Sequence, residues 1–151
     1  MELQEIINNS KHTFLHELKE LTDNYLELTL VIGRPMEPEK EIDLGGVKLS
    51  NVKELGYDKE SMFLKVIFKQ YSGYSIVNES FDNLGNDGDF TGKWLRVYTK
   101  SAFLNYINLV SFHNQISETP ILHYCFLCEN HIISVASNTS PKIEKLHTTQ
   151  K

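Results

Sequence analysis

The sequence predicts a single α+β domain over residues 1–151, with a largely antiparallel β-sheet of about six or seven strands and two main helices packed on one face. A hairpin-like stretch at residues 121–137 supplies the centre of this sheet. The predicted elements are a helix, several strands, a second helix and two final strands, which lacks the βαβ alternation of a parallel fold. A length of 151 residues is typical of one domain with its own core.

Residues 121–137 carry the strongest local signal for β-structure. An aromatic and β-branched run is followed by a polar break at Glu129-Asn130 and by a second β-branched run. Such residues fit a pleated, half-buried surface, and Asn tolerates the left-handed backbone that tight turns need. We therefore predict two antiparallel strands near the middle of the sheet.

Two segments carry apolar residues at helical spacing, and both are predicted to cover the sheet. Residues 2–22 have apolar residues three and four positions apart, with a weak patch at residues 8–10 where the helix can divide. The second helix begins near residue 102, after a cap at Thr99 or Ser101, and its apolar stripe runs to Val110.

The remaining strands are predicted from alternating or β-branched runs that end at Gly, Pro or polar residues. They cover residues 26–32, 42–44, 47–49, 62–69, 74–78 and 93–98. A turn at Gly45-Gly46 joins the second and third of these. Residues 79–92 are predicted as a polar loop and residues 138–151 as a solvated tail, flexible from about residue 144, with Pro141 and Ile143 docking on the body as an alternative.

Composition narrows the function classes. The formal net charge of −5 disfavours a general nucleic-acid binder, because phosphate contacts need clustered Lys and Arg, and it favours a basic protein partner. No apolar run approaches the roughly 20 residues that span a bilayer, and the N-terminus lacks a secretory pattern. We therefore expect a cytoplasmic protein without a membrane partner.

Cys125 and Cys128 have the spacing of a redox or zinc motif, but they lie within an apolar, strand-like run. Three residues apart on a strand, their side chains point to opposite faces, and no second cysteine pair completes a zinc site. We expect buried, reduced thiols and no metal or other cofactor. His123 and His131 flank the pair, so a small Cys/His-dependent enzyme or a metal-binding protein remains the alternative.

The acidic, glycine-rich loop after residue 81 superficially suggests a calcium site. Counted from Asn83, Gly88 falls at the sixth position of an EF-hand loop, but Gly85 takes the third and Trp94 the twelfth, where a bidentate Glu is needed. No Gly-x-Ser-x-Gly, Walker, dinucleotide or His-Glu-x-x-His motif is present either. We therefore predict no catalytic residues and no metal.

Aromatic and acidic side chains are the candidates for a protein interface. Amphipathic aromatics anchor interfaces, and acids around them would form a negative rim. The alternative is that the aromatics belong to the core and the acids to an ordinary surface. The residues predicted to contact a partner are Glu79, Asp82, Asp87, Asp89, Trp94, Glu129 and His131.

Three segments resemble parts of small bacterial proteins of the immunity type, the partners of polymorphic or contact-dependent growth-inhibition toxins. The segments are residues 74–81 (YSIVNESF), 92–106 (GKWLRVYTKSAFLNY) and 123–137 (HYCFLCENHIISVAS). The resemblance covers about residues 60–143 and contains no catalytic signature. It implies an antitoxin-like protein that neutralises a toxin domain, often a nuclease, by occluding its active site.

Three functions are thus weighed from the sequence. The first is an immunity protein that inhibits a basic toxin domain, for which a monomer is favoured. The second is the enzyme or metal-binding protein built on His123, Cys128 and His131. The third is a regulatory module that dimerises through a sheet edge or through the first helix.

Overall fold

The computed structural model describes residues 3–81 and 88–146, and these residues are mostly β-strand. Strands make up 54% of them and helices 19%, in three short α-helices and two 3₁₀ turns. The strands divide into four sheets instead of one. The predicted α+β fold, with one sheet and two helices on one face, is therefore wrong.

The first sheet has four antiparallel strands in the order β1-β2-β7-β13. They are β1 (Thr13–Leu21), β2 (Tyr25–Ile32), β7 (Met62–Phe68) and β13 (Lys142–Leu146). The predicted strands at residues 26–32 and 62–69 are confirmed. The predicted solvated tail is wrong for residues 142–146, because β13 pairs along β7. Pro141 is buried and Ile143 packs against the core, while residues 147–151 lie outside the described part.

The second sheet has five antiparallel strands in the order β8-β12-β11-β10-β9. They are β8 (Gly73–Asn78), β9 (Gly88–Thr91), β10 (Leu95–Ser101), β11 (Leu122–Leu127) and β12 (His131–Ser137). The predicted central hairpin is confirmed as β11 and β12, which lie in the middle of the sheet. Part of the predicted loop over residues 79–92 forms β9 at one edge.

The core lies between these two sheets, which pack face to face. Alternate residues of β2 and β7 are fully buried, and they meet alternate residues of β11 and β12. The ring of Phe68 on β7 contacts the rings of Tyr124 and Phe126 on β11, with centroids 5.5 and 6.3 Å apart. Because each sheet buries one face, apolar residues alternate along these strands with a period of two, and this alternation predicts the strands from the sequence.

The predicted helix over residues 2–22 is wrong beyond Asn9. Helix α1 (Leu3–Asn9) is followed by β1, which pairs with β2 through a bulge between Leu15 and Glu17. The bulge adds a residue to the strand, so that Leu15 and Leu18 both pack against the core although they are three positions apart. A spacing of three imitates the period of a helix, which misled the prediction.

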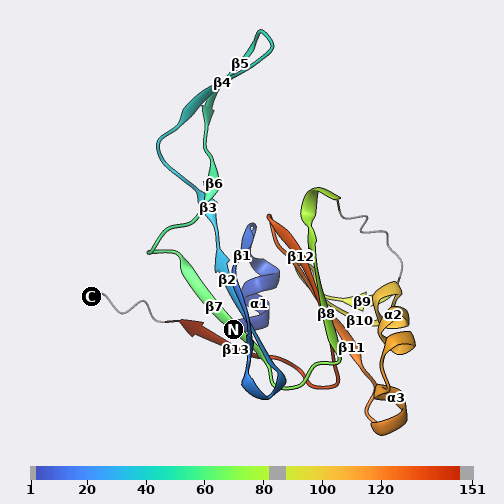
Figure 1. Cartoon of the computed structure of the whole chain (residues 1–151). Helices are drawn as coiled ribbons and strands as arrows, with labels where there is room; N and C mark the ends of the chain where they lie inside the picture. The colour runs from blue at the N-terminus through green and yellow to red at the C-terminus, as the bar shows by residue number, and fades with distance from the viewer. Residues whose placement is uncertain (1–2, 82–87, 147–151) are drawn as a thin grey trace.

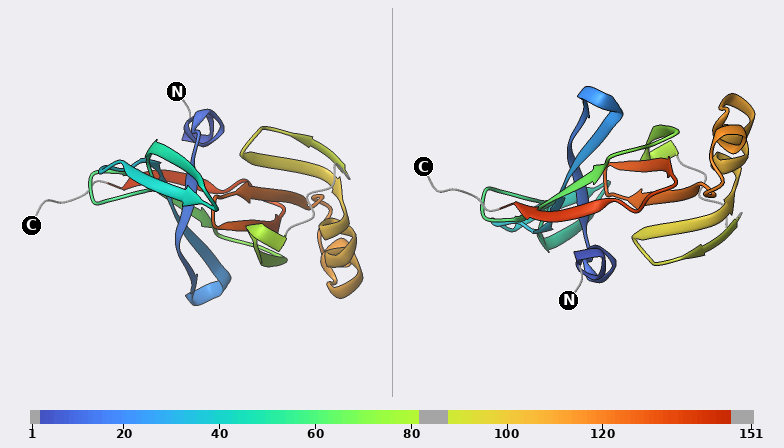
Figure 2. Two further views of the ribbon diagram at one scale, coloured as in Figure 1. Left: turned by 90° about the horizontal axis from the view of Figure 1, so that it is seen from above. Right: turned by 90° about the horizontal axis from the view of Figure 1, so that it is seen from below.

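The other helices lie beside the second sheet, away from α1 (Figures 1 and 2). The predicted helix after residue 101 is confirmed as α2 (Ala102–Val110), and Ser101 caps it by accepting a hydrogen bond from the Leu104 N–H at 3.1 Å. A second short helix, α3 (His113–Ile116), follows. The helices therefore do not share one face of a sheet.

Two asparagines hold the parts of the fold together. Asn8 of α1 accepts hydrogen bonds on one oxygen from the backbone N–H groups of Lys93, Trp94 and Leu95, at 2.9 to 3.0 Å. Asn130, in the β11–β12 turn, binds both the N–H and the carbonyl of Leu15. Each amide thus joins a segment near the N-terminus to the second sheet.

Replacing Asn8 with alanine should destabilise the protein by about 1–3 kcal/mol, because three backbone N–H groups lose their acceptor at once. Asn9→Ala is the matched control, since Asn9 is the next residue of α1 and is exposed. Urea unfolding followed by circular dichroism measures both variants. Equal midpoints for the two would show that the Asn8 contacts contribute no net stability.

Candidate functional site

The most prominent surface feature is a two-stranded arm over residues 34–56 that projects far from the body (Figure 1). Its base is the pair β3 (Arg34–Pro35) and β6 (Leu55–Gly56), and its outer part is the pair β4 (Lys40–Leu44) and β5 (Val47–Val52). The predicted short hairpin at residues 42–49 is confirmed as part of it. The Gly33 N–H donates to the His12 carbonyl at 2.9 Å, which fixes the arm to the first sheet.

One face of the arm is apolar. Ile42 lies opposite Leu49, and Leu44 lies opposite Val47, so strand alternation puts all four side chains on the same face. They are 39–62% exposed. The other face is charged: Asp43 lies opposite Lys48, whose amino group contacts Glu41 at 3.1 Å.

Gly45 and Gly46 close the tip of the arm. Both have positive φ, 65° and 98°, as a two-residue hairpin turn with the twist of the flanking strands requires. The Gly46 N–H also donates to the Asp43 carboxylate at 2.8 Å. The tip is therefore a defined turn, and it holds the apolar side chains of Leu44 and Val47 at the far end of the arm.

Ion pairs brace the sides of the arm. Lys40 contacts Glu54 at 2.7 Å, and Lys53 contacts Glu37 and Glu39. The hydrogen bond with Lys40 lowers the pKa of Glu54, and the hydrogen bond with Glu37 raises the pKa of Lys53. At the base, Arg34 lies 2.7 Å from Asp58 and is the main cause of the lowered pKa of that carboxyl. Such exposed pairs orient side chains but stabilise the fold little.

The apolar face of the arm has no cover among the described residues, and β4 and β5 pair only with each other. An isolated two-stranded hairpin is marginally stable in water, and its outer edges expose unpaired backbone groups. Exposed contiguous apolar surface beside polar groups is typical of a protein-binding site. The arrangement can therefore insert four aliphatic side chains into a partner and hydrogen-bond along an edge.

Most of the described residues that the sequence predicts as partner contacts lie at the end of the second sheet nearest the base of the arm. Glu129 is in the β11–β12 turn, His131 begins β12 opposite Asn78, and Glu79 follows Asn78 in the 3₁₀ turn η2 (Glu79–Phe81). The Trp94 carbonyl accepts from the Leu127 N–H at 2.8 Å at this same end.

Glu129 links this end of the sheet to the arm. Its carboxylate lies 2.8 Å from His12 Nδ1, and its backbone N–H donates to the Thr13 carbonyl at 2.8 Å. His12 is also the residue whose carbonyl binds Gly33 at the base of the arm. The Glu129 carboxylate therefore lies beside the point where the arm leaves the body.

Other predicted contacts lie elsewhere. Asp89, on β9, pairs with Lys100 at 3.6 Å near the opposite end of the second sheet. Trp94 is half-buried and packs against the core, so its ring has a structural role, and its contact with a partner stays a prediction. Asp82 and Asp87 lie outside the described residues. The structure thus brings together four of the predicted residues and separates Asp89 from them.

In the alternative Cys/His site, His123 lies on the opposite face from Cys128, whereas Cys128 and His131 lie opposite each other across the β11–β12 turn, where the Cys128 N–H donates to the His131 carbonyl at 2.9 Å. His123 is the second residue of β11 and stacks on Tyr98, with ring centroids 4.7 Å apart, while Cys128 follows β11 and packs into the core between the sheets. Ser101 Oγ lies 3.0 Å from His123 Nδ1, but this oxygen also accepts from the Leu104 N–H as a helix cap. Within residues 3–81 and 88–146, no group of three or more His, Cys, Asp or Glu side chains could hold a metal ion.

The cysteines are buried on opposite faces of β11, as the sequence predicts. Cys125 packs with Tyr98 on the outer face, and Cys128 packs in the main core. Burial is the main cause that raises the pKa of the Cys128 thiol, and nearby Glu129 adds to it. A thiol held protonated in this way is a poor nucleophile.

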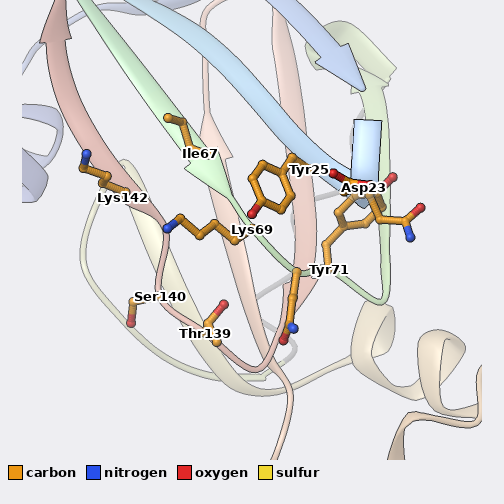
Figure 3. Close-up of a pocket in the computed structure, with 10 residues that line it drawn as sticks. Asp23, Tyr25, Ile67, Lys69, Tyr71, Thr139, Ser140 and Lys142 are labelled. Carbon is orange, nitrogen blue, oxygen red and sulfur yellow. The ribbon is translucent and has the colours of Figure 1, made fainter. Parts of the chain in front are cut away.

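A hollow of about 720 Å³ lies at the end of the first sheet, where the β1–β2 turn, the end of β7 and the segment before β13 meet (Figure 3). Lys69 lies beside the Tyr25 ring, and Lys142 lies farther from it, on β13. Tyr71 is in its wall, and its hydroxyl donates to Glu20 at 3.1 Å. The lining offers polar contacts from side chains such as Asp23 and Ser140, and it includes neither His nor Cys.

Comparisons with protein-family models, with curated proteins and with solved structures found no match to this chain. Among the described helices, none has the length and apolar character needed to cross a bilayer. The geometry of the chain itself therefore carries the functional argument.

The sequence contains a pattern that indicates the arm, but the residues predicted to contact a partner do not include it. Apolar residues alternate on both sides of Gly45-Gly46, while the flanking residues are strongly charged. A hairpin with an apolar face needs a surface to cover it, and the nearest segments in sequence offer no matching apolar run. That mismatch between a local apolar face and its neighbours favours a binding role for the arm.

The Cys128 thiol should react with Ellman's reagent only when the protein unfolds, because burial both raises its pKa and blocks access. A Cys125→Ser variant isolates the signal from Cys128. Absorbance would rise slowly in buffer at pH 8 and within minutes in denaturing urea. Rapid stoichiometric reaction of the native variant would contradict this burial.

The double substitution Leu44→Asp with Val47→Asp should change the free energy of unfolding by less than about 0.5 kcal/mol, because both side chains are exposed at the tip. By comparison, Leu30→Ala in the fully buried part of β2 should cost about 2–5 kcal/mol. Urea denaturation measures both. A large loss from the tip variant would mean that the arm stabilises the isolated fold.

Proposed function

We propose that the chain is an immunity protein that binds a bacterial toxin domain in the cytoplasm and occludes its active site. The observation that carries the proposal is the apolar face of the projecting arm, formed by Ile42, Leu44, Val47 and Leu49. An exposed apolar ribbon serves binding better than it serves the stability of the isolated chain.

The shape of the arm suits occlusion. Two antiparallel strands are narrow enough to enter a cleft, and the Gly45-Gly46 turn leads with the aliphatic pair of Leu44 and Val47. Aliphatic and aromatic anchors that fill pockets supply most of the affinity of an interface, and the outer edge of a strand can add backbone hydrogen bonds. Neutralisation by such an arm requires no reaction centre in this chain.

Charge supports a basic partner. Residues 37–54 contain five acids against three lysines, and the whole chain has a net charge of −5. Each of the lysines Lys40, Lys48 and Lys53 is already paired with a glutamate of the arm. Glu129 and Glu79 add acids on the side of the body from which the arm leaves. A nuclease carries a positive cleft for phosphate, and complementary charge speeds encounter with such a surface.

The toxin class of the partner is supported by the resemblance of residues 74–81, 92–106 and 123–137 to immunity proteins. Two of these segments form strands of the second sheet, and the third runs from β10 into α2. They supply the scaffold from which Glu79, Trp94, Glu129 and His131 are displayed, while the arm is formed by residues outside the resemblance. A divergent arm on a shared scaffold would give each protein its own partner.

Co-expression tests the proposal, with the toxin-like reading frame nearest to the gene of this chain as the partner. The wild-type chain should restore growth, and the tip variant Leu44→Asp with Val47→Asp should fail to do so, because two charges enter an apolar contact. Lys48→Ala, on the charged face of the same arm, is the matched control and should still protect. Titration calorimetry with a catalytically inactive toxin should show at least a hundredfold weaker binding for the tip variant.

Full protection by the tip variant, with unchanged affinity, would refute the arm as the binding element. A wild-type chain that fails to bind or protect against this toxin would refute the immunity function itself. Folding of each variant is checked by circular dichroism, so that loss of binding is not confused with loss of the fold.

A further inference from the structure

A second apolar surface lies at the end of the molecule opposite the arm, over α2 and α3 (Figure 1). Five large apolar side chains there are 58–86% exposed. They are Tyr106, Leu109, Val110, Phe112 and Ile116. We refer to these five residues as the α2–α3 patch. Exposure of this degree exceeds that of the apolar face of the arm.

Helix α2 carries large apolar side chains on two sides, which indicates that a surface covers each side. Leu104 and Ile107 are buried against Ile121 and Ala136, which accounts for one side of the helix. Tyr106 and Leu109 nevertheless continue the apolar character on the opposite side. Apart from Asn105 and Asn108, α2 is therefore apolar on its exposed side as well, and apolar helix faces are normally covered.

The segment that forms the patch, residues 102–117, carries no Asp, Glu, Lys or Arg, although the chain as a whole has a net charge of −5. The nearest charged residues in sequence, Lys100 and Glu118, flank it. The polar side chains among them include the exposed amides of Asn105, Asn108 and Asn114. An amide both donates and accepts hydrogen bonds, so it can pair with its own copy across a two-fold axis, where like charges would repel.

We propose that the α2–α3 patch is the contact between two copies of this chain in a two-fold symmetric dimer. Interfaces of homodimers are more apolar than those between transient partners, and the cores of interfaces are depleted of charge. Two acidic copies meet with little repulsion at a surface whose own residues, 102–117, carry no Asp, Glu, Lys or Arg. The absence of charge that suits a second copy makes the patch a poor match for the basic partner of the arm.

The size of the patch is sufficient for such a contact. With about 100–150 Å² exposed on each of five large side chains, each copy would bury on the order of 500 Å² and two copies about 1,000 Å². This total is the lower limit for a biological interface, as in a weak, reversible dimer. A hollow of about 280 Å³ beside the patch can receive a polar side chain from the second copy, since its lining includes Lys100 as well as Asn105 and Asn108.

A dimer of this form leaves both arms free. The arm and the patch lie at opposite ends of the body, so the two arms would point away from the contact (Figures 1 and 2). Dimerisation therefore does not compete with binding of a partner to the arm, and it does not depend on which partner the arm binds.

Sedimentation equilibrium of the full chain tests the dimer. The wild type should be dimeric at concentrations of about 100 μM, above the micromolar range of an interface of this size. Leu109→Asp with Ile116→Asp should shift the protein to monomer, raising the dissociation constant at least a hundredfold. Both side chains are exposed, so the fold should persist, and circular dichroism confirms it.

The arm variant Leu44→Asp with Val47→Asp is the matched control and should remain dimeric. A wild type that stays monomeric at this concentration would overturn the proposal, and the patch would then be left to a partner of another sequence. A dimer that persists in the patch variant, or dissociates in the arm variant, would place the contact elsewhere and also overturn it. None of these outcomes depends on whether the chain neutralises a toxin.

Discussion

The packing of β2 and β7 against β11 and β12 is the interaction on which the rest of the molecule depends. These four strands bury aliphatic and aromatic side chains between the sheets, and Phe68 meets Tyr124 and Phe126 there. Burial of this kind is the main source of stability in a protein of this size. Asn8 and Asn130 then fix α1 and β1 to the second sheet. The body is complete without the arm or the exposed sides of α2 and α3, so both surfaces are available for contacts with other molecules.

The independence of the body from the arm also explains why the arm is apolar on one face only. Its charged face, with Asp43 and Lys48, is well solvated in the isolated chain. Its other face, with Leu44 and Val47, contributes favourable burial free energy only when another surface covers it. Attachment through the short β3–β6 pair and through Gly33 leaves the outer strands β4 and β5 clear of the body. The chain therefore keeps apolar surface exposed, and burial of that surface on association with a partner would be favourable.

The sequence predicted local β-structure well where one face of a strand is buried and the register is regular. β7 and the β11–β12 hairpin belong to this class. It failed where a bulge broke the alternation: Leu15 and Leu18 imitated a helix because the bulge in β1 restores them to one face. The division into separate sheets was not predictable, since pairing of β13 with β7 joins segments far apart in the chain. For the candidate site, acids such as Glu129 were chosen by type, whereas the arm depends on which apolar residues remain uncovered after folding.

The two exposed apolar surfaces differ in their charge, and this difference suits the two partners that we propose. The face that contains Leu44 and Leu49 is flanked by paired and unpaired charges, which give a contact orientation and exclude wrong partners. The α2–α3 patch has no charge within residues 102–117. A surface without charge cannot steer a charged partner, but it imposes no penalty on self-contact. Because the surfaces lie at opposite ends of one packed body, a partner on one surface does not displace a partner from the other. Two acidic arms on one dimer would also raise the local concentration of binding sites for a basic partner.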